Sequence, residues 1–183
     1  TPCNIAVLAG HCTARASVAG YENRVLTDPE RKQMLEIMEQ ALKEGACGLS
    51  LGLMYEPGIY AAIEELKDVA RLCEKYDRPM TVHPRACSAV SMTYPLLGRP
   101  HLLRALDELV EIAEGTHMKL HYSHAIFVGR SSFRCKDELL AILHGFYGFF
   151  FHKYEFLILS AFKRIFFVFI IKNISYTIKV AHR

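Results

Sequence analysis

The sequence predicts an α/β fold of about four strand–helix units, followed by a C-terminal tail of different composition. Short apolar runs bounded by Gly, Pro or polar residues recur along the chain, and amphipathic stretches with helical spacing lie between them. Strands and helices in alternation indicate a parallel sheet with right-handed crossovers. The pattern suits part of a (β/α) barrel or of a doubly wound sheet, and periodicity alone does not choose between them.

The first unit starts with a strand over residues 4–9, which runs into Gly10 and His11. A helix is predicted to begin at Thr27, because Thr27 suits the N-cap, Pro29 the first turn, and Glu30 completes a capping box. Gly45 ends this helix. Its apolar stripe recurs at helical spacing and consists of Met34, Ile37, Met38, Ala41 and Leu42.

The second unit is built on the stretch GACGLSLGLMYEPGIYA, residues 45–61. Residues 48–53 are short, mostly apolar and bounded by glycines, as buried parallel strands are. Residues 54–58 break this regularity and place a turn at Pro57-Gly58. In parallel α/β folds ligands bind in the loops that follow the strands. This loop is therefore a candidate site, although an ordinary strand and loop would show the same pattern.

The remaining units follow the same scheme. After the second helix come a strand over residues 80–83, a long loop over residues 84–100, a third helix ended by Gly115, a strand over residues 118–123 and the start of a fourth helix at residues 137–143. The apolar stripe of the second helix consists of Ile63, Leu66, Val69, Ala70 and Cys73, and that of the third of Leu102, Leu106, Leu109, Val110 and Ala113.

The sequence divides into a body, residues 1–144, and a C-terminal tail, residues 145–183. Nine of the eleven Phe residues lie in it, Phe, Ile and Lys are prominent, and it shows no clear helical stripe. Lys163 and Arg164 split its apolar run, so a spanning membrane helix is not expected. We interpret the tail as an atypical segment that does not continue the native sequence; a membrane-surface segment is the alternative.

Composition excludes several classes of function. The net charge is +3, of which the part from Phe146 onward carries +5, so the rest of the chain is mildly acidic and offers no basic footprint for nucleic acid. The six cysteines contain no CxxC pair, which argues against a zinc ribbon and favours reduced thiols in a cytoplasmic protein. The chain starts at Thr1 without an initiator Met or a visible secretory signal, and we expect a fragment.

The stretch at residues 45–61 resembles the GxxGLSxGLxYxPGxYA signature of the N-acyl-D-amino-acid deacylases of the amidohydrolase superfamily. Three further segments also match the family: GHCTAR at residues 10–15, TVH ending at His83, and YSHAIFVGR at residues 122–130. The resemblance covers roughly residues 4–143. It implies a distorted TIM-type barrel, of which this chain would supply the central part, and hydrolysis of a C–N amide bond in a small N-acylated substrate.

His83 and His124 are the candidate metal ligands. Each follows the apolar run of a predicted strand, at the end where barrels build their sites, and imidazole is a good zinc ligand. The resemblance implies that the histidines at these positions bind the catalytic zinc. A lone strand-end histidine is otherwise more often structural. Strand parity puts His121 and His124 on opposite faces, and we choose His124 and interpret His121 as a packing or surface residue.

Three other residues are candidates for substrate binding. By resemblance, Tyr55 lies near the bound acyl group, where its hydroxyl could polarise a carbonyl. His11 also ends a strand and is given a minor role beside the site or the substrate. Arg85 could pair with a substrate carboxylate in bidentate fashion, although a solvated loop arginine is the simpler reading. We expect His101 and His117 to be solvated.

Other parts of the family's site have no match in this chain. The resemblance implies an HxH pair and a metal-binding cysteine before Thr1, and an aspartate general base beyond the matched region. Ala125 and Ile126 replace polar residues of the family's SHHK segment. We therefore expect no catalytic residue in this chain, little activity in isolation, and self-association through open sheet edges. An inactive barrel fragment or interaction module is the alternative; a nucleotide-binding domain ranks last because no GxGxxG or P-loop glycine run occurs.

Overall fold

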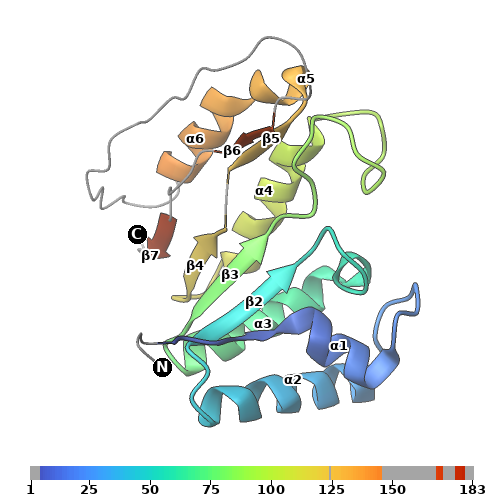
Figure 1. Cartoon of the computed structure of the whole chain (residues 1–183), viewed down its shortest axis with the longest axis vertical. Helices are drawn as coiled ribbons and strands as arrows, with labels where there is room; N and C mark the ends of the chain where they lie inside the picture. The colour runs from blue at the N-terminus through green and yellow to red at the C-terminus, as the bar shows by residue number, and fades with distance from the viewer. Residues whose placement is uncertain (1–4, 124, 146–167, 171–175, 180–183) are drawn as a thin grey trace.

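The computed structural model describes residues 5–123, 125–145, 168–170 and 176–179. Its main sheet has the strand order β1-β2-β3-β4-β7, with β1 to β4 parallel and β7 antiparallel to β4 (Figure 1). A two-stranded antiparallel sheet pairs β5 with β6. The strands are β1 (Leu8–Gly10), β2 (Gly48–Gly52), β3 (Pro79–His83), β4 (Lys119–Tyr122), β5 (Ile126–Val128), β6 (Val168–Ile170) and β7 (Tyr176–Lys179).

Helices connect the parallel strands. The long ones, α2, α3 and α4, connect β1 to β2, β2 to β3 and β3 to β4 in turn, and shorter elements lie in the loops between them (Figure 1). The helical elements are α1 (His11–Ala19), α2 (Asp28–Lys43), the 3-10 helix η1 (Gly58–Tyr60), α3 (Ile63–Lys75), α4 (His101–Ala113), α5 (Arg130–Phe133) and α6 (Lys136–Gly145).

The strand order decides between the two architectures that the sequence left open. In a doubly wound sheet the order reverses at a switch point, and helices cover both faces. Here β1, β2, β3 and β4 are neighbours in chain order and all parallel. Consecutive right-handed crossovers then place the connecting helices on one face of the sheet, as in a (β/α) barrel. The predicted partial barrel is confirmed.

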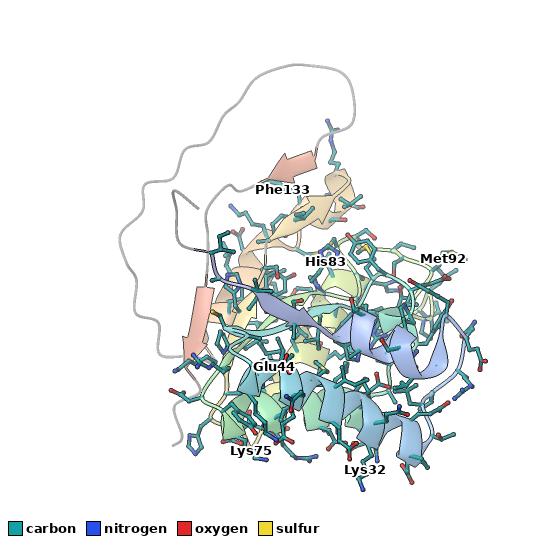
Figure 2. All side chains as sticks on the ribbon, turned by 60° about the horizontal axis from the view of Figure 1, so that its bottom comes forward. Lys32, Glu44, Lys75, His83, Met92 and Phe133 are labelled. Atoms are coloured by element: carbon teal, nitrogen blue, oxygen red, sulfur yellow. The ribbon has the colours of Figure 1, made fainter. Side chains whose placement is uncertain are left out.

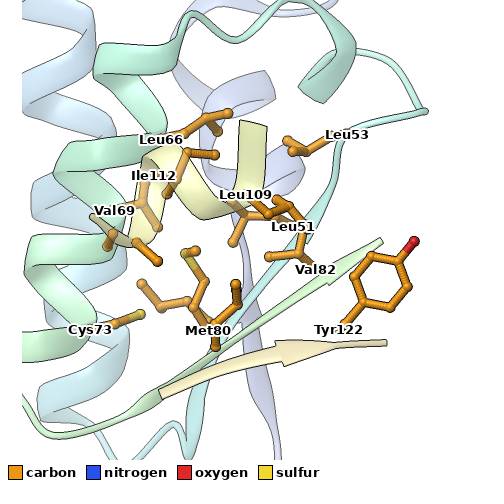
Figure 3. Close-up of a cluster of buried hydrophobic side chains, with 14 of the residues drawn as sticks. Leu51, Leu53, Leu66, Val69, Cys73, Met80, Val82, Leu109, Ile112 and Tyr122 are labelled. Carbon is orange, nitrogen blue, oxygen red and sulfur yellow. The ribbon is translucent and has the colours of Figure 1, made fainter. Parts of the chain in front are cut away.

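The hydrophobic core lies between the sheet and the helices. Side chains alternate between the two faces of a strand, so Leu51, Val82 and Tyr122 share the face that meets α3 and α4 (Figure 3). Leu66, Val69 and Cys73 of α3 and Leu109 and Ile112 of α4 pack against that face, and all of them are completely buried. The predicted stripes of both helices are therefore core, which explains why these residues form amphipathic helices.

Most predicted element boundaries are close to those observed, but the first strand, predicted over residues 4–9, is the shorter Leu8–Gly10. Helix α2 begins with the capping box of Thr27 and Glu30, in which the Thr27 backbone N–H donates to the Glu30 carboxylate at 2.9 Å. The stripe of α2 is buried at Met34, Met38 and Leu42, whereas Ile37 is 40% exposed. Two helices were not predicted: the four-residue helix α5, and α1, because the stretch after Gly10 is rich in small and polar residues and has no apolar stripe.

The tail falls mainly outside the described residues. Of the tail, only Gly145 at the end of α6 and the strands β6 and β7 are described, and β7 extends the main sheet antiparallel to β4. The interpretation of residues 145–183 as non-native sequence remains a prediction. Within the described part of the chain, no helix has both the length and the apolar character needed to cross a membrane.

Candidate functional site

The second face of the main sheet carries polar side chains. Ser50, Thr81 and His121 occupy one register row across β2, β3 and β4, and all three are half-buried. The Thr81 and Ser123 hydroxyls are hydrogen-bonded at 3.0 Å. Because alternate residues of β2, β3 and β4 fill the hydrophobic core, this face corresponds to the interior of a barrel, where polar groups can meet a ligand.

His83 lies at the carboxyl end of this polar face. It is the last residue of β3 and pairs in register with Gly52, the last residue of β2. The Tyr55 ring packs on the imidazole, with ring centroids 4.9 Å apart and planes inclined by 33°. The Cys87 Sγ atom lies 4.0 Å from His83 Nε2. The structure therefore brings together two of the predicted site residues, His83 and Tyr55, at the sheet edge where barrels bind ligands.

The loop over residues 84–100 rises beside this edge. Figure 2 shows His83 and Met92 on one side of the molecule and Lys32 and Lys75 on the other. Met92, Leu96 and Leu97 are exposed apolar residues of this loop. Tyr55 is 57% exposed, so it lies at the surface rather than in the core.

The second predicted ligand, His124, lies outside the described residues. Its neighbour Ser123 is described: the Ser123 N–H donates to the Val82 carbonyl at 3.0 Å, so this segment leaves β4 beside the end of β3. His121 is on the same polar face as His83, two register positions away from it, and burial lowers the pKa of its imidazole. The convergence of His83 and His124 on one ion remains a prediction.

Arg85 is engaged by the protein rather than open to a substrate. Its guanidinium forms a bidentate pair with the Glu108 carboxylate at 2.8 and 3.0 Å, and it donates to the carbonyls of Ile59 and Ala61 at 2.6 and 3.1 Å. The side chain is 8% exposed. Burial lowers the pKa of Arg85, but the hydrogen bonds that Arg85 donates to the Glu108 carboxylate outweigh this effect and raise the pKa, so the guanidinium stays charged. Arg85 ties α4 to the loop after β2.

His11 is likewise enclosed. It opens α1 instead of lining the mouth of the sheet, its side chain has no exposed surface, and its Nε2 atom lies 2.7 Å from Glu65 Oε1 of α3. Arg15 donates to the same oxygen at 3.0 Å and to the Arg24 carbonyl at 2.7 Å.

Neither Glu65 nor Glu108 was singled out from the sequence. For Glu65 the sequence did contain a signal: it lies four residues before Val69 and eight before Cys73, so it shares the apolar stripe of its helix. An acidic residue on such a stripe indicates a buried partner.

His101 corrects the expectation of a solvated residue. It is 2% exposed, and both ring nitrogens are hydrogen-bonded within the loop over residues 84–100. The Ser91 N–H donates to Nδ1 at 2.7 Å, so Nδ1 carries no proton, and Nε2–H then donates to the Pro95 carbonyl at 2.9 Å. His101 therefore fixes the loop that follows His83.

We expect His101→Ala to lower the free energy of unfolding by about 2 kcal/mol, because it leaves the Ser91 N–H and the Pro95 carbonyl without partners and opens a cavity. Urea titration monitored by circular dichroism measures the change. Met92→Ala, at a fully exposed position of the same loop, is the control and should change stability by less than about 0.5 kcal/mol. Equal effects of the two variants would contradict this role of His101.

The described residues do not by themselves complete a metal site. No cluster of three or more His, Cys, Asp or Glu side chains suited to a metal ion occurs in the described part of the chain. A catalytic zinc ion uses three protein ligands, and of the predicted pair only His83 is described. The edge of the sheet at His83 can thus supply one metal-coordinating side chain, with the aromatic ring of Tyr55 packed beside it.

Sequence comparison finds relatives of known activity but no matching family model. The chain is 29% identical over 140 residues to a D-aminoacylase of Alcaligenes xylosoxydans xylosoxydans, which corresponds to 76% of this chain and 27% of the relative. It is 29% identical over 137 residues to an N-acyl-D-aspartate deacylase of the same organism. The chain spans about a quarter of the length of the curated relatives that it matches, 27% and 26%.

Solved structures give the same result. The crystal structure of D-aminoacylase superimposes with a TM-score of 0.68 at 28% identity, over 78% of this chain and 28% of that protein. An N-acyl-D-glutamate deacylase of Bordetella bronchiseptica, solved with zinc and a phosphonate inhibitor, also gives a TM-score of 0.68, at 27% identity. A third structure concerns the binuclear metal centre of D-aminoacylase. Sequence and structure therefore point to one group of proteins over three quarters of the chain.

Proposed function

We propose that this chain, which is similar to part of the N-acyl-D-amino-acid deacylases, supplies part of the barrel of a metal-dependent hydrolase that deacylates N-acyl-D-amino acids. The single observation that carries the proposal is the place of His83: at the carboxyl end of a parallel strand, on the polar face of the sheet, with Tyr55 packed on its ring.

Zinc is the metal that this proposal implies. When bound, zinc acts as a Lewis acid that polarises a carbonyl oxygen. In this chain His83 and His124 would hold it, and the Tyr55 hydroxyl, on a ring stacked against His83, would orient the acyl carbonyl by hydrogen bonding. Since two imidazoles are fewer than the usual three protein ligands, the remaining ligands and the general base would come from parts of the barrel not matched here.

Arg85 and His11 serve this site indirectly in the proposal. Arg85 holds the carbonyls of Ile59 and Ala61, which follow the Tyr55 turn, so it fixes the loop that carries the tyrosine. His11 is bonded to Glu65 and fixes α1 against α3. The substrate would be a small N-acylated molecule. Strand β1 pairs only with β2 among the described strands, and self-association through this edge remains our expectation for the chain alone.

The test combines the isolated chain with a chimera. In the chimera, residues 5–143 of this chain replace the matching segment of the Alcaligenes D-aminoacylase. We expect the isolated chain to release no measurable amino acid from N-acetyl-D-amino acids, and the chimera to release it in a zinc-dependent manner. His83→Ala in the chimera should reduce kcat/KM by more than about 100-fold, since even residues behind metal ligands contribute 10- to 100-fold.

The control is His117→Ala in the same chimera. His117 is exposed and lies before β4, at the opposite end of the sheet from His83, so its replacement should leave kcat/KM within about twofold. Circular dichroism and zinc analysis confirm that each chimera is folded and show how much metal it holds. A folded chimera whose activity survives His83→Ala would overturn the assignment, and zinc-dependent deacylation by the isolated chain would overturn the expectation that it is inactive alone.

A further inference from the structure

A surface pocket opens at the carboxyl edge of the main sheet, between α1 and the turn after β2. Its volume is about 330 Å³, near the lower end of the range for small-molecule sites, so it can hold one part of a ligand such as a side chain. The polar groups of its lining are the hydroxyls of Thr13, Ser17 and Tyr21 and the carboxylate of Glu56.

The pocket adjoins the site at His83. Gly52 is the register partner of His83, and by strand alternation it shares the polar face of Ser50. A Cβ atom at Gly52 would therefore point to that face, where it would lie 3.0 Å from Tyr55 Cδ2 and 3.8 Å from Sγ of Cys12, a residue of the pocket lining. The pocket thus begins one strand away from the proposed metal ligand, and a substrate held at His83 can extend into it.

The turn that carries Glu56 folds tightly back onto β2 and α1. A Cβ atom at Gly58 would lie 2.6 Å from the Gly52 carbonyl oxygen and 2.7 Å from Cys12 Sγ, so this close approach requires glycine. The Tyr60 hydroxyl donates to Glu56 Oε1 at 2.6 Å. This hydrogen bond raises the pKa of Tyr60, so the hydroxyl keeps its proton and remains a donor. The carboxylate at the pocket is therefore held in place by its own turn.

The charge of this carboxylate is not balanced within the pocket. No Lys, Arg or His side chain is among the residues that line it. On the adjoining helix and loop, Arg15 is paired with Glu65 and Arg24 with Glu30. The Tyr21 residue, 68% exposed, offers an aromatic ring on which a cation can rest. A lining with one carboxylate and an aromatic ring attracts an ammonium or guanidinium group and repels a second carboxylate.

We propose that this pocket receives the side chain of the N-acyl-D-amino acid, and that Glu56 makes it prefer basic side chains, such as that of lysine, over acidic ones. The inference rests on the proposed deacylase function and names its substrate class more narrowly. Repulsion of the wrong partner is a common source of specificity. Because all these substrates carry the same α-carboxylate, the charge of the side chain is what the pocket distinguishes.

The first test measures binding to the full 183-residue chain and needs no activity. In an NMR titration at low salt, N-acetyl-D-lysine should shift the backbone amide signals of Thr13, Ser17 and Glu56. Its Kd should be at least about fivefold lower than that of N-acetyl-D-glutamate, the discrimination expected of one partly exposed charge pair. Glu56→Gln should remove this difference. Equal affinities for the two ligands, or no shifts at the pocket with either, would overturn the proposal.

The second test measures deacylation by the chimera that contains residues 5–143. The ratio of kcat/KM for N-acetyl-D-lysine to that for N-acetyl-D-glutamate should fall at least about fivefold in Glu56→Gln, which keeps an acceptor for the Tyr60 hydroxyl but removes the charge. Glu44→Gln is the matched control: Glu44 is exposed and lies before β2, at the opposite end of the sheet, so its replacement should leave the ratio within about twofold.

The two tests separate this inference from the proposed function. An inactive chimera would contradict the deacylase function, while the binding titration would still decide whether the pocket prefers basic ligands. An active chimera whose substrate ratio does not respond to Glu56→Gln would overturn the role of the pocket alone.

Discussion

Replacing Glu65 by alanine should lower the free energy of unfolding by about 3 to 5 kcal/mol, the cost of removing one partner from a buried ion pair. Glu65 is 1% exposed and accepts hydrogen bonds from both His11 and Arg15. Arg15 has no exposed side-chain surface, so its charge would stay buried without a carboxylate to balance it. Glu65 thus joins α3 to two residues of α1.

Urea unfolding monitored by circular dichroism measures this effect on the full chain. Glu64→Ala is the matched control, because Glu64 lies on the same helix with 59% of its side chain exposed; we expect a change below about 0.5 kcal/mol. The double variant Arg15→Met with Glu65→Met removes both charges at similar volume and should recover part of the loss. If Glu65→Ala cost no more than Glu64→Ala, the buried cluster would not stabilise the fold.

Arg85→Met should lower the free energy of unfolding by about 2 to 4 kcal/mol. The substitution keeps the apolar part of the side chain but leaves Glu108 without its bidentate partner and the carbonyls of Ile59 and Ala61 without their donor. The Tyr94 hydroxyl donates to Glu108 at 2.9 Å, so the Glu108 carboxylate keeps one hydrogen bond in the variant. We therefore expect a slightly smaller loss of stability than for Glu65→Ala.

A double-mutant cycle with Glu108→Leu tests the pair directly. The double variant should be more stable than the sum of the single losses predicts, by at least about 1 kcal/mol, because no uncompensated charge remains. Arg71→Met is the control: Arg71 forms a surface ion pair with Asp68, with 60% of the Arg71 side chain exposed, and the substitution should change stability by less than about 0.5 kcal/mol. Additive losses in the cycle would mean that Arg85 and Glu108 do not stabilise each other.

Much of the architecture could be predicted from local sequence, because the signals are local. The helix start at Thr27 depends on residues within one turn, and the stripes of α3 and α4 repeat at helical spacing within a single segment. The same applies to His83, whose place at the end of a strand follows from the apolar run before it. Helix α1 escaped prediction because its small and polar residues give no periodic apolar signal.

The partners of charged residues required the tertiary structure. Glu65 is 54 residues from His11, and Glu108 is 23 residues from Arg85, so no local pattern links them. Position in sequence suggested that His11 and Arg85 face a substrate. Instead, α3 supplies His11 with the buried carboxylate of Glu65, and α4 supplies Arg85 with the partly buried carboxylate of Glu108. The burial of His101 arises in the same way, from the folding of a long loop back on its helix.

The amino-acid sequence by itself determined the alternation of strands and helices, their approximate limits, and the histidine at the end of β3, because each depends on the chemistry of neighbouring residues. Only the tertiary structure decided that the four parallel strands lie in chain order, that one face of the sheet is polar, and that His11 and Glu65 form a buried pair. These features arise where segments far apart in the chain exclude water together, and the free energy of that burial depends on the partner as much as on the residue.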